Sequence, residues 1–215
     1  MIKAVIFDMD GTLVDTLTDL THFVNLTLRH FGWKEISRDS VRRYTGDGAR
    51  LLIERALREA GDPDRLDEVL AFYSAAYNAC PIYKLSAYDG IPETLAALKT
   101  RGVRLAVLTN KPHPAASEIA EKLFPGVFDI VQGDDGCHAL KPDPAAALDI
   151  LPRFDVTKEE CVFVGDSAVD VKTGVSAGMK TVGVTWGFRD RQDLEQNGAT
   201  VIIDDPRALL NAILN

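Results

Sequence analysis

The sequence predicts an α/β protein with a doubly wound parallel sheet and a small helical domain inserted after the first strand. Three observations lead to this prediction. Short apolar runs recur without alternating apolar and polar residues, which is typical of strands buried on both faces of a parallel sheet. Most runs are separated by one helix-length segment. The exception is a gap of about 95 residues between the first and second runs, far more than one helix needs.

Six apolar runs are expected to be strands, and the segments before four of them are expected to be helices. Gly102 and Gly178 are suited to ending two of these helices, because glycine readily adopts the left-handed conformation found there. The expected strands are IKAVIFD (2–8), VRLAVLTN (103–110), FDIVQGD (128–134), CVFVGD (161–166), KTVGVTW (180–186) and ATVIIDD (199–205). The expected helices are PETLAALKTRG, PHPAASEIAEKLF, PDPAAALDILPRF and SAVDVKTGVSAG.

The long gap after the first strand is expected to hold a helical domain, which we call the cap. Residues 16–31 place their apolar side chains on one helical face and are followed by Gly32 as a stop. Residues 47–60 and 64–79 also have a helical pattern. We therefore assign residues 15–84 to the cap and residues 1–14 and 85–215 to the α/β core domain. The two crossings between these domains, at residues 14–17 and 84–89, are candidate hinges.

Composition narrows the classes of function. The 215 residues carry a formal net charge of −8, which argues against general affinity for nucleic acid or anionic membranes. Any anionic substrate must therefore meet local cations. The three cysteines are odd in number and widely spaced, which fits neither a disulfide framework nor a zinc site. No apolar run approaches the roughly 20 residues that span a bilayer, and no leader pattern is present, so we expect a cytoplasmic protein.

Polar side chains collect where the expected strands end. In an open parallel sheet, ligands bind outside the carboxyl ends of the strands. Here the runs end at Asp8, at Thr109 and Asn110, and at Asp166, and the loop sequence LKPDP contributes Lys141. Four separate segments of the chain are therefore expected to meet at one edge of the sheet.

Asp8 and Asp10 lie two residues apart at the mouth of the first strand. Two poorly hydrated carboxylates repel each other unless a cation or a shared proton compensates. Magnesium prefers oxygen ligands and is commonly held by one or two carboxylates together with substrate phosphate oxygens. Asp8 and Asp166 suit that description. With its charge neutralised, Asp8 would attack phosphorus as a nucleophile, and Asp10 would serve as general acid and base.

Charge that develops on a transferring phosphoryl group needs donors as well as a metal ion. We expect Thr109 to supply a hydroxyl, and backbone N–H groups near Gly11 and Asn110 to supply more. Lys141 is expected to be the one obvious cation. Asp170 lies four residues after Asp166 and would orient a metal-bound water or another ligand. Ser167 and Asp170 also form a capping-box pattern, so Asp170 alternatively only caps a helix.

These residues resemble the phosphatase branch of the haloacid dehalogenase superfamily. The matching motifs are D-x-D-G-T at 8–12, the strand ending in Thr109-Asn110, K-P-D-P at 141–144 and G-D-S-x-x-D at 165–170. The resemblance implies Mg²⁺ held by the Asp8 carboxylate, the Asp10 backbone carbonyl and Asp166. It also implies that residues 15–84 correspond to the cap of this branch.

Three stretches resemble phosphoglycolate phosphatases more closely: YTGDGARLLIERAL at 44–57, YDGIPETLAALK at 88–99 and TNKP at 109–112. This resemblance implies a small phosphorylated metabolite, 2-phosphoglycolate, as substrate. We expect the protein to be a monomer or homodimer. In the cap, Gly46 and Gly48 flank a turn that would reach over the substrate. Arg43 and Arg50 are candidates for contact with a substrate carboxylate.

Other functions remain open from the sequence. The protein could be a phosphatase of another substrate: pyrophosphate, a sugar phosphate, a nucleotide or pyridoxal phosphate. The mechanism would then be the same, but the leaving group would differ. An isomerase similar to β-phosphoglucomutase would return the phosphoryl group to a sugar. A module that only binds phosphate would need no acid/base residue, so Asp10 argues against that alternative.

Overall fold

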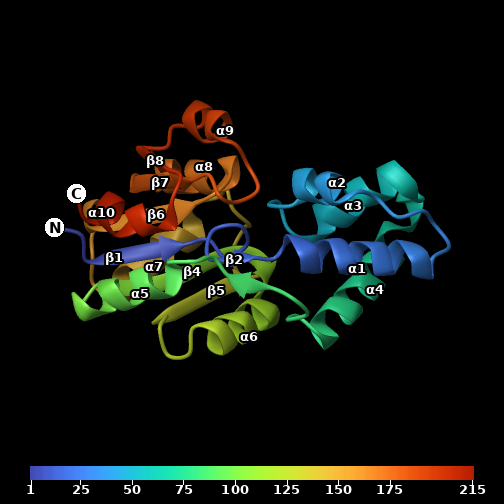
Figure 1. Cartoon of the computed structure of the whole chain (residues 1–215), viewed down its shortest axis with the longest axis horizontal. Coiled ribbons are helices and arrows are strands. Elements are labelled where there is room, and N and C mark those ends of the chain that lie inside the picture. The colour runs from blue at the N-terminus through green and yellow to red at the C-terminus, as the bar shows by residue number, and fades with distance from the viewer.

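The structure is a computed structural model that describes residues 1–215. A six-stranded sheet forms one half of the molecule and four helices of the cap form the other, with both chain ends at the far side of the sheet from the cap (Figure 1). The strand order is β5-β4-β1-β6-β7-β8, and all neighbours are parallel. The strands are β1 (Ala4–Phe7), β4 (Arg104–Pro112), β5 (Ile130–Asp134), β6 (Cys161–Gly165), β7 (Lys180–Val184) and β8 (Val201–Ile203). The predicted fold class and all six predicted strands are confirmed.

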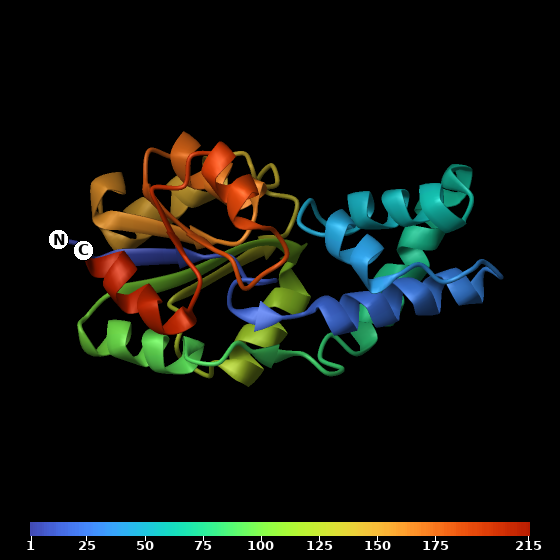
Figure 2. The ribbon, with the colours of Figure 1, turned by 45° about the horizontal axis from the view of Figure 1, so that its top comes forward.

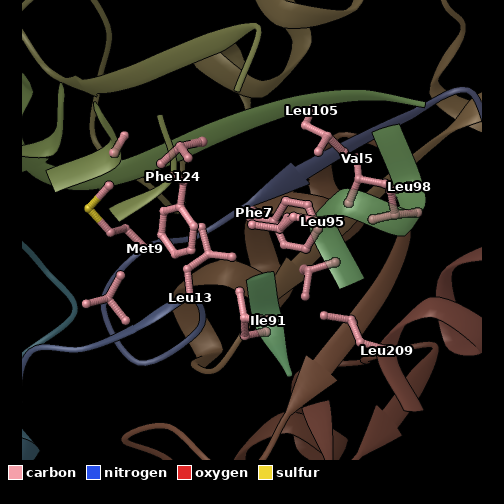
Figure 3. Packing of buried hydrophobic residues seen from close by; sticks show 14 of the residues in the cluster. Val5, Phe7, Met9, Leu13, Ile91, Leu95, Leu98, Leu105, Phe124 and Leu209 are labelled. Carbon is pink, nitrogen blue, oxygen red and sulfur yellow. The ribbon is translucent and has the colours of Figure 1, made fainter. Parts of the chain in front are cut away.

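Strand β1 shows why the apolar runs lack alternation. It pairs with β4 on one side and with β6 on the other, and all four of its residues are fully buried. Val5 and Phe7 point into one hydrophobic cluster, while Ala4 and Ile6 point into another on the opposite face. Figure 3 shows Phe7 in the first cluster beside Leu95. Because both faces are covered, both sets of side chains must be apolar.

Helices cover the two faces of the sheet. The first cluster takes buried residues from α5, α6 and α10, and the second takes them from α7 and the end of α8. No helix in the structure is both long and apolar enough to cross a membrane. The core helices are α5 (Ile91–Thr100), α6 (His113–Leu123), α7 (Ala145–Phe154), α8 (Ala168–Ser176), α9 (Arg191–Gln196) and α10 (Leu209–Leu214). Three short 3₁₀ turns lie at Pro63–Arg65, Lys158–Glu160 and Pro206–Ala208.

The cap contains α1 (Leu17–His30), α2 (Arg38–Tyr44), α3 (Ala49–Ala60) and α4 (Leu66–Ala79). These helices share a hydrophobic cluster that is separate from the two clusters of the sheet, and Figure 2 shows them beside the sheet rather than on its faces. The sequence pattern predicted α1, α3 and α4 but missed α2. Only Ser40 and Val41 of α2 are buried, so no apolar stripe marks it. Ser37 caps this helix by accepting a hydrogen bond from the backbone N–H of Ser40.

The chain leaves and re-enters the core through a two-stranded antiparallel ribbon. Its strands are β2 (Val14–Asp15) and β3 (Ser86–Ala87), which lie in the two predicted hinges. Asp19, at the start of α1, is fully buried and accepts hydrogen bonds from the backbone N–H groups of Tyr83 and Lys84. The returning segment is therefore tied to the departing one. The division of the chain at residues 15 and 84 stays a prediction.

Candidate active site

The strand order brings the predicted polar residues together. Strand β1 lies between β4 and β6, so Asp8, Thr109 and Asp166 emerge side by side at the carboxyl ends of three neighbouring strands. The loop before α7 adds Lys141, and all four side chains are buried. They line a cavity between the sheet edge and the cap, with about 740 Å³ of empty space including its mouth. This cavity is the candidate active site.

Lys141 is the cation at the centre of the site. Its Nζ lies 2.6 Å from Oδ1 of Asp8 and 2.6 Å from Oδ1 of Asp170. Burial alone lowers the pKa of Lys141, but the two carboxylates raise it more, so the net shift of its pKa is upward. Lys141 is therefore a fixed positive charge, and it leaves Oδ2 of Asp8 without any hydrogen bond from a protein donor.

The carboxyl groups of Asp8 and Asp166 both have raised pKa values. Burial, followed by repulsion from Asp170, raises the pKa of Asp8 from its ordinary 3.8 to about 7. The pKa of Asp166 is likewise raised, first by burial and then by the charges of Asp170 and Asp8. One lysine does not neutralise three carboxylates. The part of the site around Asp8, Asp166 and Asp170 is therefore short of positive charge, as expected for one that takes up a cation.

Asp166 is held on both oxygens. Oδ1 accepts a hydrogen bond of 3.2 Å from the Thr12 hydroxyl, and Oδ2 accepts one of 2.7 Å from the Phe188 backbone N–H. Two glycines make room for this carboxylate, because a Cβ atom on Gly11 or Gly187 would come within 3.0 Å of it. Gly11 is not among the residues that line the cavity, and its predicted role as a substrate contact stays a prediction. Its missing side chain gives space to Asp166.

Three carboxylates fit a hard divalent cation. Each of Asp8, Asp166 and Asp170 offers an oxygen, and these oxygens lie within 4.8 Å of one another. The set contains no histidine or cysteine, which favours magnesium over zinc. Oδ1 of Asp170 contacts Lys141, and its Oδ2 accepts from the Ser167 hydroxyl and backbone N–H at 2.6 and 3.1 Å. Asp170 thus caps α8 and also holds Lys141, so both of its oxygens are engaged. Asp8, by contrast, has one oxygen without a hydrogen bond from the protein.

A second buried lysine was missed by the sequence analysis, which expected Lys141 to be the one obvious cation. Nζ of Lys111 lies 3.1 Å from Oδ1 of Asp10 and donates a hydrogen bond of 2.8 Å to the Tyr77 hydroxyl of α4. Burial lowers the pKa of Lys111, but the charge of Asp10 and the interactions with Tyr77 and Tyr73 together raise it by more. The prediction ended this strand at residue 110, whereas β4 runs to Pro112. Lys111 therefore belongs to the strand end that lines the cavity.

Asn110 joins the cap to the loop that carries Lys141. Its side-chain nitrogen donates to the carbonyl oxygens of Gly46 and Lys141 at 3.1 and 3.0 Å, and its side-chain oxygen accepts from the Lys141 N–H at 2.8 Å. Gly46 and Gly48 both line the cavity. Their turn is braced by the ion pair between Asp47 and Arg55, whose closest atoms are 2.6 Å apart.

The two cap arginines proposed from the sequence lie elsewhere. Arg50 pairs with Asp67 at 2.9 Å, and its side chain is 61% exposed. Arg43 donates to the Ser40 hydroxyl. Neither arginine lines the cavity, so the structure does not support either as a substrate contact. On α3 the buried side chains belong to Leu52 and the residues in phase with it, which turns Arg50 toward solvent.

Two other arginines fasten the cap to the core. Arg189, in the loop after β7, donates three hydrogen bonds of 2.7–3.2 Å to carbonyl oxygens of Arg42, Arg43 and Thr45 at the end of α2. In return, Arg42 donates to the carbonyl oxygens of Phe188 and Gly187 at 2.8 and 3.2 Å. The Phe188 ring packs into the cap cluster. The loop that holds Asp166 is thus also the loop that grips the cap.

The sequence model of the haloacid dehalogenase-like hydrolase family matches residues 5–184 of this chain. The chain belongs to the haloacid dehalogenase-like hydrolases. The phosphoglycolate phosphatase of Pseudomonas putida (strain KT2440) is 35% identical, over 97% of this chain and 78% of the relative. That of Colwellia psychrerythraea (strain 34H) is 34% identical, over 97% of this chain and 95% of the relative.

Solved structures of other proteins share the whole architecture of this chain. A protein of Lactobacillus delbrueckii subsp. bulgaricus, provisionally named phosphoglycolate phosphatase, has a TM-score of 0.93 at 31% identity, covering 99% of this chain and 98% of that one. CbbY from Rhodobacter sphaeroides, in complex with phosphate, has a TM-score of 0.81 at 26% identity, covering 99% of both chains. The family and the hydrolase class predicted from the sequence are confirmed.

Proposed function

We propose that the chain is a Mg²⁺-dependent phosphatase that hydrolyses 2-phosphoglycolate through an aspartyl phosphate on Asp8. The observation that carries this proposal is the setting of Asp8. One of its oxygens is fixed by Lys141, whereas the other is free of protein donors and borders the cavity. A carboxylate that is buried, short of positive charge and open on one oxygen is suited to attack phosphorus once a cation is bound.

In the first step, the free oxygen of Asp8 attacks phosphorus while the bond from phosphorus to the ester oxygen breaks. Asp10 gives a proton to the departing oxygen. In the second step, Asp10 takes a proton from water, which attacks the phosphorus of the aspartyl phosphate and restores the Asp8 carboxylate. Lys141 and the Thr109 hydroxyl are the donors for charge on the phosphoryl oxygens, with the backbone N–H of Asn110 beside them.

Asp8 and Asp166 would hold Mg²⁺ directly, with the Asp10 backbone carbonyl as a third ligand and Asp170 one shell farther out. Bound Mg²⁺ offsets the repulsion among the carboxylates and the charge of the phosphate. Thr12 and the Phe188 N–H keep Asp166 in place before the ion arrives. The Gly46–Gly48 turn covers the cavity from the cap side and would help to exclude water.

The choice of 2-phosphoglycolate is supported by the names of the relatives, several of which are phosphoglycolate phosphatases at 33–35% identity. The structure of CbbY was solved in complex with phosphate, which supports a site for a phosphoryl group in this fold. The test is phosphate release, with Mg²⁺ and with chelator, from 2-phosphoglycolate, pyrophosphate, sugar phosphates, nucleotides and pyridoxal phosphate. We expect a preference for 2-phosphoglycolate that the chelator abolishes.

Other outcomes of this test have distinct meanings. Release that persists at full rate in chelator contradicts the metal requirement. A preference for another ester withdraws the substrate and keeps the mechanism. If no ester releases phosphate but a sugar phosphate is isomerised, the chain is a mutase rather than a hydrolase.

A further inference from the structure

Lys111 has a setting that the proposed reaction does not yet use. Its side chain is only 3% exposed, and its ammonium group lies between Asp10 of the core and Tyr77 of the cap. The same ammonium group stands 4.8 Å from the centre of the Tyr77 ring. A lysine is seldom buried so completely unless its charge has a partner or a task.

Among the cations around the cavity, Lys111 has hydrogen-bond donors that the protein does not use. Three cations line this cavity: Lys111, Lys141 and Arg189. Lys141 is engaged by two carboxylates, and Arg189 by three backbone carbonyls. Lys111 makes one hydrogen bond, to a neutral phenol, and Oδ1 of Asp10 receives no hydrogen bond despite lying 3.1 Å away. An ammonium group has three donors, so two are open to an anion.

The place of Lys111 decides which part of a substrate it would meet. The phosphoryl group belongs beside Asp8 and Lys141, whereas Asp10 is the group that protonates the leaving oxygen. Because Lys111 contacts Asp10 and not Asp8, an anion at Lys111 lies at the leaving-group end of the substrate. Tyr77 closes that end from the cap, and Ser74 and Asn78 of α4 line the same cavity.

We propose that Lys111 and Tyr77 form a carboxylate subsite, which selects phosphate esters of short hydroxy acids over esters of neutral alcohols. This inference rests on the proposed phosphatase function. The ammonium group supplies the charge, and the Tyr77 hydroxyl accepts one N–H from Lys111 and donates its own proton to the carboxylate. Since Tyr77 belongs to the cap, a bound carboxylate also draws the cap and core together.

The experiment compares two substrates that differ in one group. In ethyl phosphate a methyl group replaces the carboxylate of 2-phosphoglycolate. We measure kcat/KM for both esters in the wild type, in Lys111→Met and in Tyr77→Phe. Lys122→Met is the matched control, because Lys122 is exposed and has no ion pair. Binding of 3-phosphonopropionate and propylphosphonate by calorimetry gives a second reading that needs no turnover.

We expect Lys111→Met to lower kcat/KM for 2-phosphoglycolate by about 30-fold more than for ethyl phosphate, as for loss of a buried charged contact. Tyr77→Phe should shift the same ratio in the same direction by a smaller factor. In Lys111→Met, binding of 3-phosphonopropionate should weaken while the affinity for propylphosphonate stays unchanged. The control Lys122→Met should match the wild type in both measurements.

Equal losses for both esters in Lys111→Met, with unchanged discrimination between the two phosphonates, overturn the carboxylate subsite and leave Lys111 as a support for Asp10. This failure is distinguishable from failure of the proposed function. In the latter case the wild type itself shows no preference for 2-phosphoglycolate over ethyl phosphate. If Lys111→Met does not fold, the ratio measured in Tyr77→Phe decides, and an unchanged ratio there contradicts the subsite.

Discussion

The metal-free protein should become less stable as the pH rises from 4 to 7, and Asp8 should be a main cause. The pKa of Asp8 is about 7 in the folded protein against 3.8 ordinarily. Between these values the folded state binds a proton that the unfolded state has lost, so the free energy of unfolding falls as pH rises. The difference of about 3 pH units corresponds to about 4 kcal/mol in all, of which about 3 kcal/mol falls between pH 5 and 8.

The variant Asp8→Asn removes this titration. We expect the free energy of unfolding in chelator, from urea curves followed by circular dichroism, to fall between pH 5 and 8 by about 3 kcal/mol more in the wild type than in Asp8→Asn. Asp149→Asn makes the same charge change at an exposed position without an ion pair, and it should follow the wild type. Equal pH slopes in the wild type and Asp8→Asn would refute the electrostatic account of the site.

Two further variants test how Asp166 and the cap are held. Gly187→Ala puts a Cβ within 3.0 Å of Asp166 and of the Gly11 carbonyl oxygen. The variant should therefore lose about 1–3 kcal/mol of unfolding free energy and bind Mg²⁺ about 10-fold more weakly in calorimetry. An unchanged Mg²⁺ affinity would contradict this packing argument. Arg189→Ala removes three hydrogen bonds to the cap, so kcat/KM should fall about 10-fold or more; an unchanged value would show that these bonds do not seat the cap.

The fold was predictable because its sheet is buried on both faces. A strand such as β1 must be apolar at every position, and that pattern is visible without a structure. The end of β4 was harder to place. Lysine and proline have low strand propensity, yet Lys111 and Pro112 both belong to β4. The predicted strand therefore ended at residue 110, and the second cation of the site, Lys111, was missed.

The residues that meet in the candidate site were predictable, but the contacts that hold them in place were not. Asp8, Asp166 and Lys141 follow from strand ends and motif spacing, which topology brings together. Contacts such as that between Phe188 and Asp166 join loops 22 residues apart and leave no local signal. Arg50 shows the opposite error, because closeness in sequence to the Gly46–Gly48 turn says nothing of helix phase. The apolar residues of α3, which face away from Arg50, contained that information.

The central claim is that Asp8 forms a covalent bond to phosphorus, and acid-quench labelling tests it most directly. In Asp10→Asn, acetyl phosphate should still phosphorylate the protein, because its leaving group needs no proton, while loss of the base slows hydrolysis of the product. We expect a label that is stable to acid, released by hydroxylamine, located by mass spectrometry on Asp8, and absent without Mg²⁺ or from Asp8→Asn/Asp10→Asn. A label of equal amount in the double variant, or at another residue, would contradict the account.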